Sequence, residues 1–95
     1  MNTDVNLSSS KIQMNLDDAN GFHLRPMAKV VQIASQFQSE VFIECNDVRA
    51  NGKSILELMM LQISPKTEFT VLAYGDDSTD AVQAIREFFR NFTGD

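Results

Sequence analysis

The sequence holds one cysteine, one histidine, no tryptophan and only two prolines among its 95 residues. Because Cys45 has no second cysteine to pair with, an internal disulfide is excluded, and we expect the reducing cytoplasm as its environment. One histidine and one cysteine also fall short of the ligand set of a zinc site, so we expect no metal and no cofactor. No apolar run approaches the ~20 residues of a membrane-spanning helix, so we expect no membrane insertion.

Basic residues are the minority among the charged ones, since 8 lysines and arginines stand against 13 aspartates and glutamates, for a formal net charge of -5 at pH 7. That balance argues against general nucleic-acid binding, which needs a basic surface. It favours protein partners that present basic groups. Residues 1–10 are polar and lack the pattern of a secretory signal, so we expect a flexible N-terminal extension ahead of a single domain at residues 11–95.

The sequence does contain a regular succession of strand and helix patterns. Ile12, Met14 and Leu16 alternate with polar residues, as in a strand with one buried face. The predicted strands are residues 11–16, 41–45, 48–50 and 68–74, and the predicted helices are residues 24–37, 54–61 and 78–92. The order βαββαβα indicates an α+β fold, with helices on one face of a mixed or antiparallel sheet.

Short polar segments are expected to connect these elements or to begin them. Asn46 and Asp47 predict the tight turn of a hairpin. Ser54 and Glu57 match a capping box, in which the serine side chain caps the helix and the glutamate reaches back to it. Asp77 is the expected N-cap of the last helix.

The segment Gly21-Phe22-His23-Leu24-Arg25-Pro26 holds the only histidine, where a turn gives way to the first predicted helix. The first backbone N–H groups of a helix lack internal partners and carry partial positive charge, so a helix start can hold phosphate. An imidazole there, with the Arg25 guanidinium beside it, could accept a phosphoryl group and release it again. The alternative is that His23 is a structural residue that caps the helix or lies on the surface.

The segment Asn20-Gly21-Phe22-His23-Leu24-Arg25-Pro26, together with Lys53-Ser54-Ile55-Leu56, resembles the histidine-containing phosphocarrier (HPr) family of the bacterial phosphoenolpyruvate-dependent sugar phosphotransferase system. The likeness extends over residues 11–92. It implies an open-faced β-sandwich, in which three helices pack on one face of a four-stranded antiparallel sheet. It also implies a phosphotransfer carrier rather than a turnover enzyme.

The resemblance implies a role for each residue of the first motif. His23 would take a phosphoryl group at Nδ1 from phosphorylated enzyme I and pass it to an enzyme IIA domain of a sugar permease. Arg25 would stabilise the phosphate, with support from Asn20 and from the backbone amides of Leu24 and Arg25. The family expectation is a monomer.

Several positions depart from the family pattern. Leu24 replaces a small residue and Phe22 is bulkier than the usual aliphatic residue, and both flank His23, where they bear on the fit of partners. Asp47 stands in place of a hairpin glycine. Gln62 and Lys66 stand where glycines are common, in the loop after the second helix. None of these changes removes a group that phosphoryl transfer needs.

Ser54 has two interpretations. As the N-cap of a short helix it is fully explained by structure. In some members of the resembled family, however, the serine that follows lysine here is phosphorylated by a dedicated ATP-dependent kinase, HPr kinase/phosphorylase, which regulates carbon metabolism. A phosphate at a helix start is physically favourable, so such a modification would act mainly on partners.

The short helix after Ser54 carries more apolar residues than one buried side can hold, so some must be exposed. These residues are Ile55, Leu56, Leu58, Met59, Met60 and Leu61. We expect the surplus to form a docking patch near His23, where flexible methionines fit several partners. By resemblance, Leu56 and Met59 belong to the patch and Lys29 and Lys53 border it; core packing and plain solvent exposure are the alternatives.

Two other functions stay open from the sequence. One is a regulatory HPr paralogue, in a nitrogen-related branch or a signalling role through Ser54, which binds regulators without carrying sugar flux. The other is a small α+β ligand-binding or assembly domain in which His23 is structural. The pairing of His23 with Arg25 favours a carrier over that last alternative.

Overall fold

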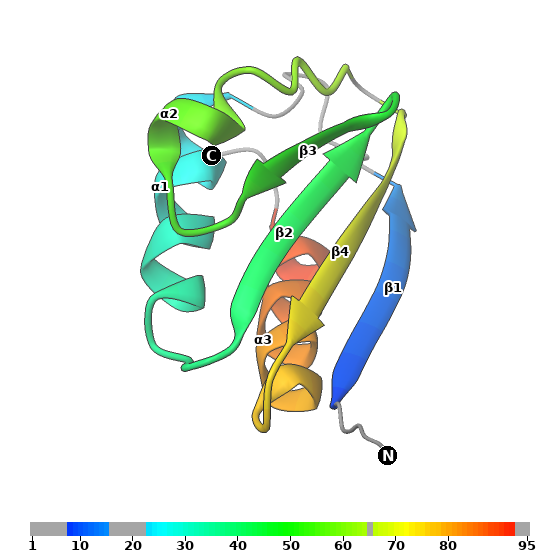
Figure 1. Cartoon of the computed structure of the whole chain (residues 1–95). Coiled ribbons are helices and arrows are strands. Elements are labelled where there is room, and N and C mark those ends of the chain that lie inside the picture. Colours follow the sequence, from blue (N-terminus) through cyan, green and yellow to red (C-terminus); the bar gives the residue numbers. More distant parts are fainter. Residues whose placement is uncertain (1–7, 16–22, 65, 93–95) are drawn as a thin grey trace.

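The structure is a computed structural model that describes residues 8–15, 23–64 and 66–92. Within these residues, four strands and three helices follow one another in the order βαββαβα (Figure 1). They are β1 (Ser9–Asn15), α1 (Leu24–Ala34), β2 (Glu40–Cys45), β3 (Val48–Asn51), α2 (Ile55–Leu58), β4 (Glu68–Tyr74) and α3 (Ser78–Asn91).

The strands form one antiparallel sheet in the order β1-β4-β2-β3. In its centre, Val71 of β4 pairs with Ile12 of β1 on one side and with Ile43 of β2 on the other. Helices α1 and α3 pack against each other behind the sheet, and α2 lies against α1 and β3 (Figure 1). The predicted open-faced β-sandwich is therefore confirmed.

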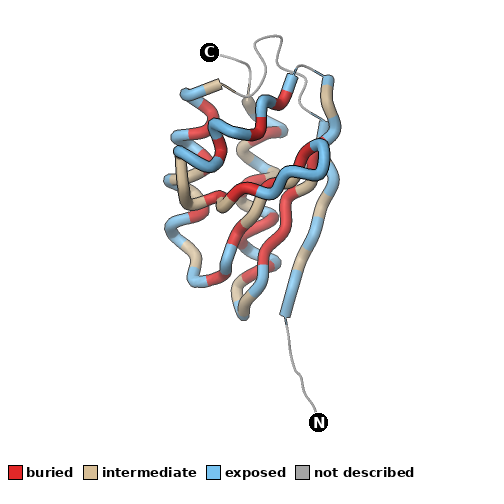
Figure 2. Tube along the Cα trace, turned by 45° about the horizontal axis from the view of Figure 1, so that its top comes forward, coloured by how far each residue is buried: buried red, intermediate tan, exposed pale blue. Residues whose placement is uncertain are grey.

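The core lies between the sheet and the helices, because alternate strand residues point toward the apolar stripes of α1 and α3. Figure 2 shows buried positions recurring along the central strands and on the helix sides that face them. The largest fully buried aliphatic side chains among the described residues come from both layers, and they include Val30, Val41, Ile43, Leu58, Val71 and Ile85. Burial of one such side chain is worth about 1.5–3 kcal/mol, so this layer holds α1 firmly in place.

Strand β1 begins before the predicted boundary of the domain. Ser9 pairs with Tyr74 and Ser10 with Ala73, so both residues belong to the sheet and not to an N-terminal extension. Strand pairing uses backbone N–H and C=O groups, which polar residues provide as well as apolar residues do. The Ser10 hydroxyl also lies 3.0 Å from the hydroxyl of Thr79 at the start of α3.

Two helices end earlier than their apolar patterns predict. Helix α1 ends at Ala34, and the Phe37 amide then donates to the Ala34 carbonyl at 3.2 Å. Helix α2 ends at Leu58, and the Leu61 amide donates to the Leu58 carbonyl at 3.1 Å. Each chain segment thus leaves its helix through a tighter turn, which keeps the next apolar residue directed at the core.

Three of the positions that depart from the family pattern adopt left-handed backbone conformations. Asp47 has φ 67 and follows Asn46 with φ 53, as the two-residue turn of a β-hairpin requires. Gln62 has φ 52 and Lys66 has φ 64. The loop after α2 therefore keeps a geometry suited to glycine, at a cost of about 1–2 kcal/mol for each residue that carries a Cβ.

Asp77 occupies the predicted N-cap position of α3, but its carboxylate does not cap that helix. Its oxygens accept hydrogen bonds from the Gln38 and Ser39 amides, both at 2.9 Å, and from the Ser39 hydroxyl. Hydrogen bonds from Ser39 and Gln38 hold the pKa of Asp77 below its ordinary value of 3.8. The carboxylate thus joins the start of α3 to the connection between α1 and β2.

Candidate functional site

His23 is the N-cap residue of α1. Its backbone is extended, with φ -101 and ψ -175, and its carbonyl accepts the first helical hydrogen bond from the Met27 amide at 3.1 Å. Pro26, buried in the first turn, has no N–H to offer. The amides of Leu24 and Arg25 are therefore the first-turn donors, which α-helical geometry leaves without an intrahelical partner.

The His23 imidazole is half-buried, and its Nε2 atom is buried. The ring centroid lies 6.4 Å from that of Phe92, the C-cap residue of α3, with the two rings tilted by 47°. The start of α1 and the end of α3 together position the ring. Burial of Nε2 hinders an incoming group there, which leaves Nδ1 as the candidate acceptor.

Arg25 follows two residues after His23, with its side chain exposed. With the residues that the structure describes, its guanidinium makes no hydrogen bond or ion pair, so its charge is available to an anion. Leu24 is also exposed and contributes its backbone amide to the first turn. Asn20, the remaining predicted phosphate-supporting residue, lies outside the described part of the chain.

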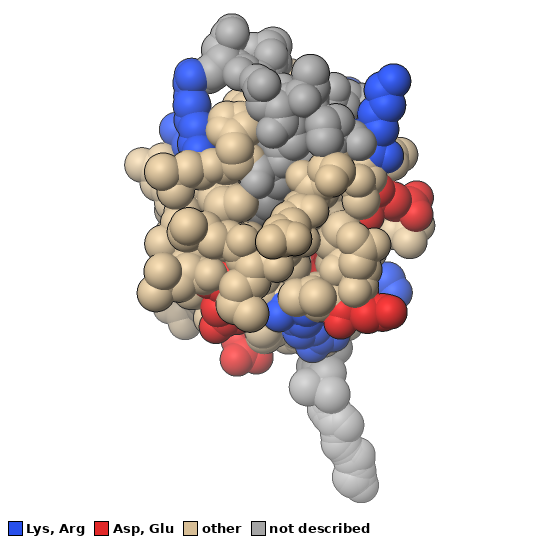
Figure 3. Space-filling view, turned by 90° about the horizontal axis from the view of Figure 1, so that it is seen from above, with Lys and Arg blue, Asp and Glu red and all other residues tan. Residues whose placement is uncertain are grey.

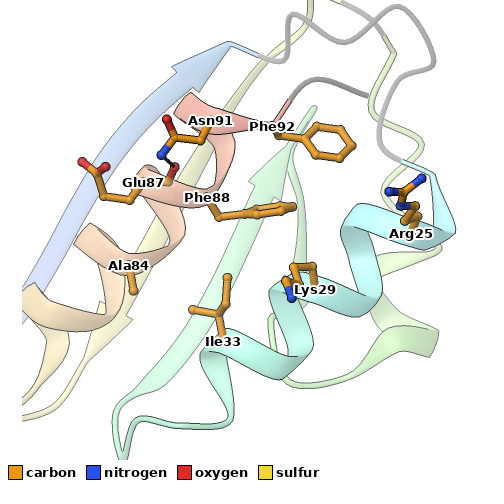
Figure 4. Close-up of a pocket in the computed structure, with 8 residues that line it drawn as sticks. All are labelled: Arg25, Lys29, Ile33, Ala84, Glu87, Phe88, Asn91 and Phe92. Atoms are coloured by element: carbon orange, nitrogen blue, oxygen red, sulfur yellow. Dashed lines mark hydrogen bonds between the residues drawn. The ribbon is translucent and has the colours of Figure 1, made fainter. Parts of the chain in front are cut away.

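A cleft of about 570 Å³ opens between α1 and α3 (Figure 4). Arg25 and Lys29 line it from α1, and Ala84, Phe88 and Phe92 line it from α3 and its C-cap. We call it the α1–α3 cleft. The apolar spacing of the α3 aromatic residues in the sequence gives no signal of a cleft, because a cleft depends on how two helices diverge.

Ser54 caps α2 as predicted, since its hydroxyl accepts a hydrogen bond from the Glu57 amide at 3.3 Å. The other half of the predicted capping box, in which the Glu57 side chain reaches back to Ser54, is wrong. The Glu57 carboxylate accepts from the Asn51 amide at 2.9 Å, while the Ser54 amide donates to the Asn51 carbonyl at 3.0 Å. The β3–α2 turn brings the Asn51 amide within reach, so Glu57 ties the helix to the end of β3.

The predicted surplus of apolar residues is exposed. Leu56 is 75% exposed, Met59 53% and Met60 67%, and Leu24 at the start of α1 is 62% exposed. We call these four residues the apolar patch. Figure 3 shows this end of the molecule covered largely by uncharged side chains, with charged side chains of both signs toward its margin. From the sequence, only Leu56 and Met59 are assigned to the patch and not Met60, because apolar spacing in so short a helix does not tell which residues face outward.

The two lysines predicted to border the patch, Lys29 and Lys53, differ from each other in exposure and in contacts. Lys29 is exposed and lines the α1–α3 cleft. Lys53 is half-buried, and its Nζ donates to the Phe37 carbonyl at 2.8 Å. Lys53 therefore ties the start of α2 to the end of α1.

No helix within residues 8–15, 23–64 and 66–92 is long and apolar enough to cross a membrane. The same residues contain no group of three histidine, cysteine or acidic side chains placed to hold a metal ion. Cys45 is buried at the end of β2, where its Sγ lies 3.7 Å from the Glu68 carbonyl oxygen and burial raises the pKa of its thiol.

Comparison with known proteins gives consistent matches. The family model for the PTS HPr component phosphorylation site matches residues 10–91. The phosphocarrier protein HPr of Neisseria meningitidis is 40% identical over 75 residues, which are 79% of this chain and 84% of that protein. A crystal structure of HPr from Thermoanaerobacter tengcongensis is 30% identical, with a TM-score of 0.84 over 90% of this chain and 97% of that one.

A third match is a crystal structure of the Bacillus subtilis catabolite repression protein Crh, described as a dimer with a swapped domain. It is 38% identical, with a TM-score of 0.69 over 76% of this chain and 83% of that one.

Proposed function

The chain belongs to the HPr phosphocarrier family, and we propose that it carries a phosphoryl group on His23, received from phosphorylated enzyme I and passed to an enzyme IIA domain. The observation that supports this role best is the half-buried imidazole at the N-cap of α1, with Nε2 buried and the exposed Arg25 two residues on. Phosphotransfer needs such a nucleophile beside donors that compensate negative charge.

In the forward step, the lone pair of the neutral His23 Nδ1 attacks phosphorus on enzyme I. The new N–P bond forms as the old bond breaks, and the donor group leaves with its electron pair. The amides of Leu24 and Arg25 and the Arg25 guanidinium offset the charge on the phosphoryl oxygens, with Asn20 in support. Transfer to an enzyme IIA domain repeats the step with His23 as the leaving group.

A labelling experiment tests this function. We expect incubation with enzyme I and phosphoenolpyruvate to add one acid-labile phosphate, detected by mass spectrometry. His23→Ala should abolish the label while the circular dichroism spectrum stays unchanged. Gln32→Ala, at an exposed position on the same helix, is the matched control and should label normally. A label retained in His23→Ala would contradict the proposal.

We infer that the partners dock on the apolar patch, because exposed apolar surface of this kind marks interaction sites. Leu56 and Met59 provide its α2 side, and Lys29 and Lys53 add positive charge near it. Leu56→Glu should weaken binding of enzyme I without unfolding the protein, since that side chain contributes little to the core.

A regulatory role through Ser54 is the second candidate function, and the likeness to Crh favours it. A phosphate on Ser54 would lie at the start of α2. Its oxygens could accept the hydrogen bond that the Glu57 amide now donates to the Ser54 hydroxyl. Incubation with HPr kinase/phosphorylase and ATP should then give an acid-stable phosphate that Ser54→Ala lacks. Absence of that phosphate would remove the regulatory role.

We propose that the protein works as a monomer in the cytoplasm, as expected for the family. Helices and strands of one chain form the core described above, with no contribution needed from a second copy. The dimer with a swapped domain described for Crh is the alternative. Sedimentation velocity distinguishes the two, since a swapped dimer would have a larger sedimentation coefficient and twice the mass of the monomer.

A further inference from the structure

Apart from Arg25, the residues that line the α1–α3 cleft have no role in the chemical step of the phosphoryl transfer described above. Its volume of about 570 Å³ lies within the range of about 300–1,000 Å³ that is typical of small-molecule sites. Phe92 lies at the cleft and also against the His23 ring, so the cleft adjoins the histidine. A ligand held there would therefore lie next to the phosphoryl-accepting residue.

One rim of the cleft carries positive charge that no described residue neutralises. Arg25 and Lys29 lie one helical turn apart on α1, both exposed (Figure 4). Neither makes a hydrogen bond or an ion pair with the described residues. Glu87, the only carboxylate among the described residues of the cleft, pairs instead with Arg90 at 3.3 Å.

The opposite side of the cleft, formed by α3 and its C-cap, carries two aromatic rings beside the polar side chains of Glu87 and Asn91. The rings of Phe88 and Phe92 lie 5.3 Å apart, tilted by 41°, and both are half-buried. Ile33 and Ala84 continue this surface on the two helices. A planar apolar body can pack against such rings, because aromatic pairs favour offset and edge contacts.

We propose that the α1–α3 cleft binds a small organic anion, with its apolar, planar body against Phe88 and Phe92 and its phosphate or carboxylate group on Arg25 and Lys29. The two halves of the cleft match the two halves of such a molecule in charge and polarity. The Arg25 guanidinium provides a planar set of donors for the anionic group, and Lys29 adds a second charge.

Ligand binding and phosphorylation compete for one side chain. This part of the inference rests on the proposed function, in which Arg25 stabilises the phosphoryl group on His23. A phosphoryl group would draw the guanidinium away from the cleft, and a ligand would hold it there. Because linkage is reciprocal, phosphorylation weakens ligand binding by the factor by which the ligand disfavours phosphorylation.

Binding is measured on the unphosphorylated full chain by a ¹H–¹⁵N NMR titration with phenyl phosphate. We expect saturable shifts at Lys29, Ile33, Ala84 and Phe88. Inorganic phosphate and benzyl alcohol each present half of the ligand and should bind at least about tenfold more weakly, as expected when one set of contacts is lost.

Variants locate the binding site. Ala84→Leu fills the cleft from α3 and should abolish the saturable shifts, while Gln83→Leu, exposed on the same helix and outside the cleft, should leave them unchanged. Lys29→Gln gives a second test that does not alter packing and should weaken binding about tenfold. Equal binding by the original chain and both cleft variants would overturn the inference.

Coupling is then measured as the rate at which enzyme I and phosphoenolpyruvate label His23. Phenyl phosphate should slow labelling of the original chain and not of Ala84→Leu, which controls for direct effects on enzyme I. Normal labelling without any shift in the cleft would overturn this inference and leave the proposed function intact. Shifts in the cleft of a chain that enzyme I never labels would support the site and refute the proposed function.

Discussion

At the scale of single residues, a few side chains combine tasks that the sequence presents as separate. Arg25 follows the proposed phosphoryl acceptor by two residues and also lines the α1–α3 cleft. Phe92 ends α3 and packs against the His23 ring. Lys53 holds the end of α1 through the Phe37 carbonyl. Local contacts of this kind make specific substitutions informative.

Arg25→Ala should slow phosphoryl transfer by at least about tenfold, because it removes a charge-assisted contact to the phosphoryl oxygens. The fold should persist, since the side chain is exposed and makes no contact that the core needs. Arg25→Lys should restore part of the rate. Rapid-quench transfer from phosphorylated enzyme I measures the effect, with Lys11→Ala on β1 as the charge-matched control. An unaltered rate in Arg25→Ala would remove Arg25 from the mechanism.

Gln62→Gly should stabilise the protein by about 0.5–1 kcal/mol. The left-handed backbone at this exposed position costs a residue with a Cβ about 1–2 kcal/mol, and glycine removes this cost. The greater conformational freedom of glycine in the unfolded chain offsets part of that stabilisation. Urea unfolding measures the change. The matched control is Gln32→Gly in the interior of α1, which should destabilise by about 1 kcal/mol. Destabilisation by both substitutions would contradict the account of the loop.

At the scale of elements, the helices are held to their neighbours by polar contacts at their ends. Glu57 ties α2 to the end of β3, and Asp77 ties the start of α3 to the connection after α1. Both side chains lie where capping was predicted, and both bond to backbone groups of other segments. The position of a cap was visible in the sequence, whereas its partner depended on the packed fold.

The Asp77 contact makes stability depend on pH. Because folding lowers its pKa below 3.8, the contribution is full above that value and is lost as the pH falls through 3.8 toward the lower folded-state pKa. Asp77→Asn should therefore be less stable than the original chain at neutral pH, and the difference should shrink as the pH falls below about 4. Urea unfolding across that range measures it.

Asp76→Asn is the matched control for Asp77→Asn. The Asp76 carboxylate makes no hydrogen bond with the described residues, so this substitution should leave the free energy of unfolding nearly unchanged. A constant difference between Asp77→Asn and the original chain from about pH 3 to pH 7 would show that the carboxylate charge is not what stabilises the contact.

At the scale of the whole molecule, the architecture was predictable and several of its contacts were not. Strand β4 has its predicted bounds, because the turn residues at both of its ends are clear. The helical pattern that ends at Phe37 does not distinguish the last turn of a helix from a tighter turn, so the end of α1 was placed too late. Phe92 ends the predicted helix 78–92, and its place in the sequence does not indicate that its ring meets His23.

The candidate site was predictable in its local part. His23 at a helix start, followed by Arg25 and Pro26, is contained in a few consecutive residues. The contact of the His23 ring with Phe92 and the α1–α3 cleft depend on α3 and its C-cap, which lie far along the chain, so no local pattern contains them.

The proposed function requires that the Nδ1 atom of His23 receives the phosphoryl group. Side-chain ¹H–¹⁵N correlation spectra of the ¹⁵N-labelled protein, recorded after treatment with enzyme I and phosphoenolpyruvate, distinguish the two ring nitrogens of His23. We expect a phosphorylated Nδ1, because Nε2 is buried. A phosphate on Nε2, or an imidazole left unmodified under conditions that label the Neisseria meningitidis HPr, would contradict it.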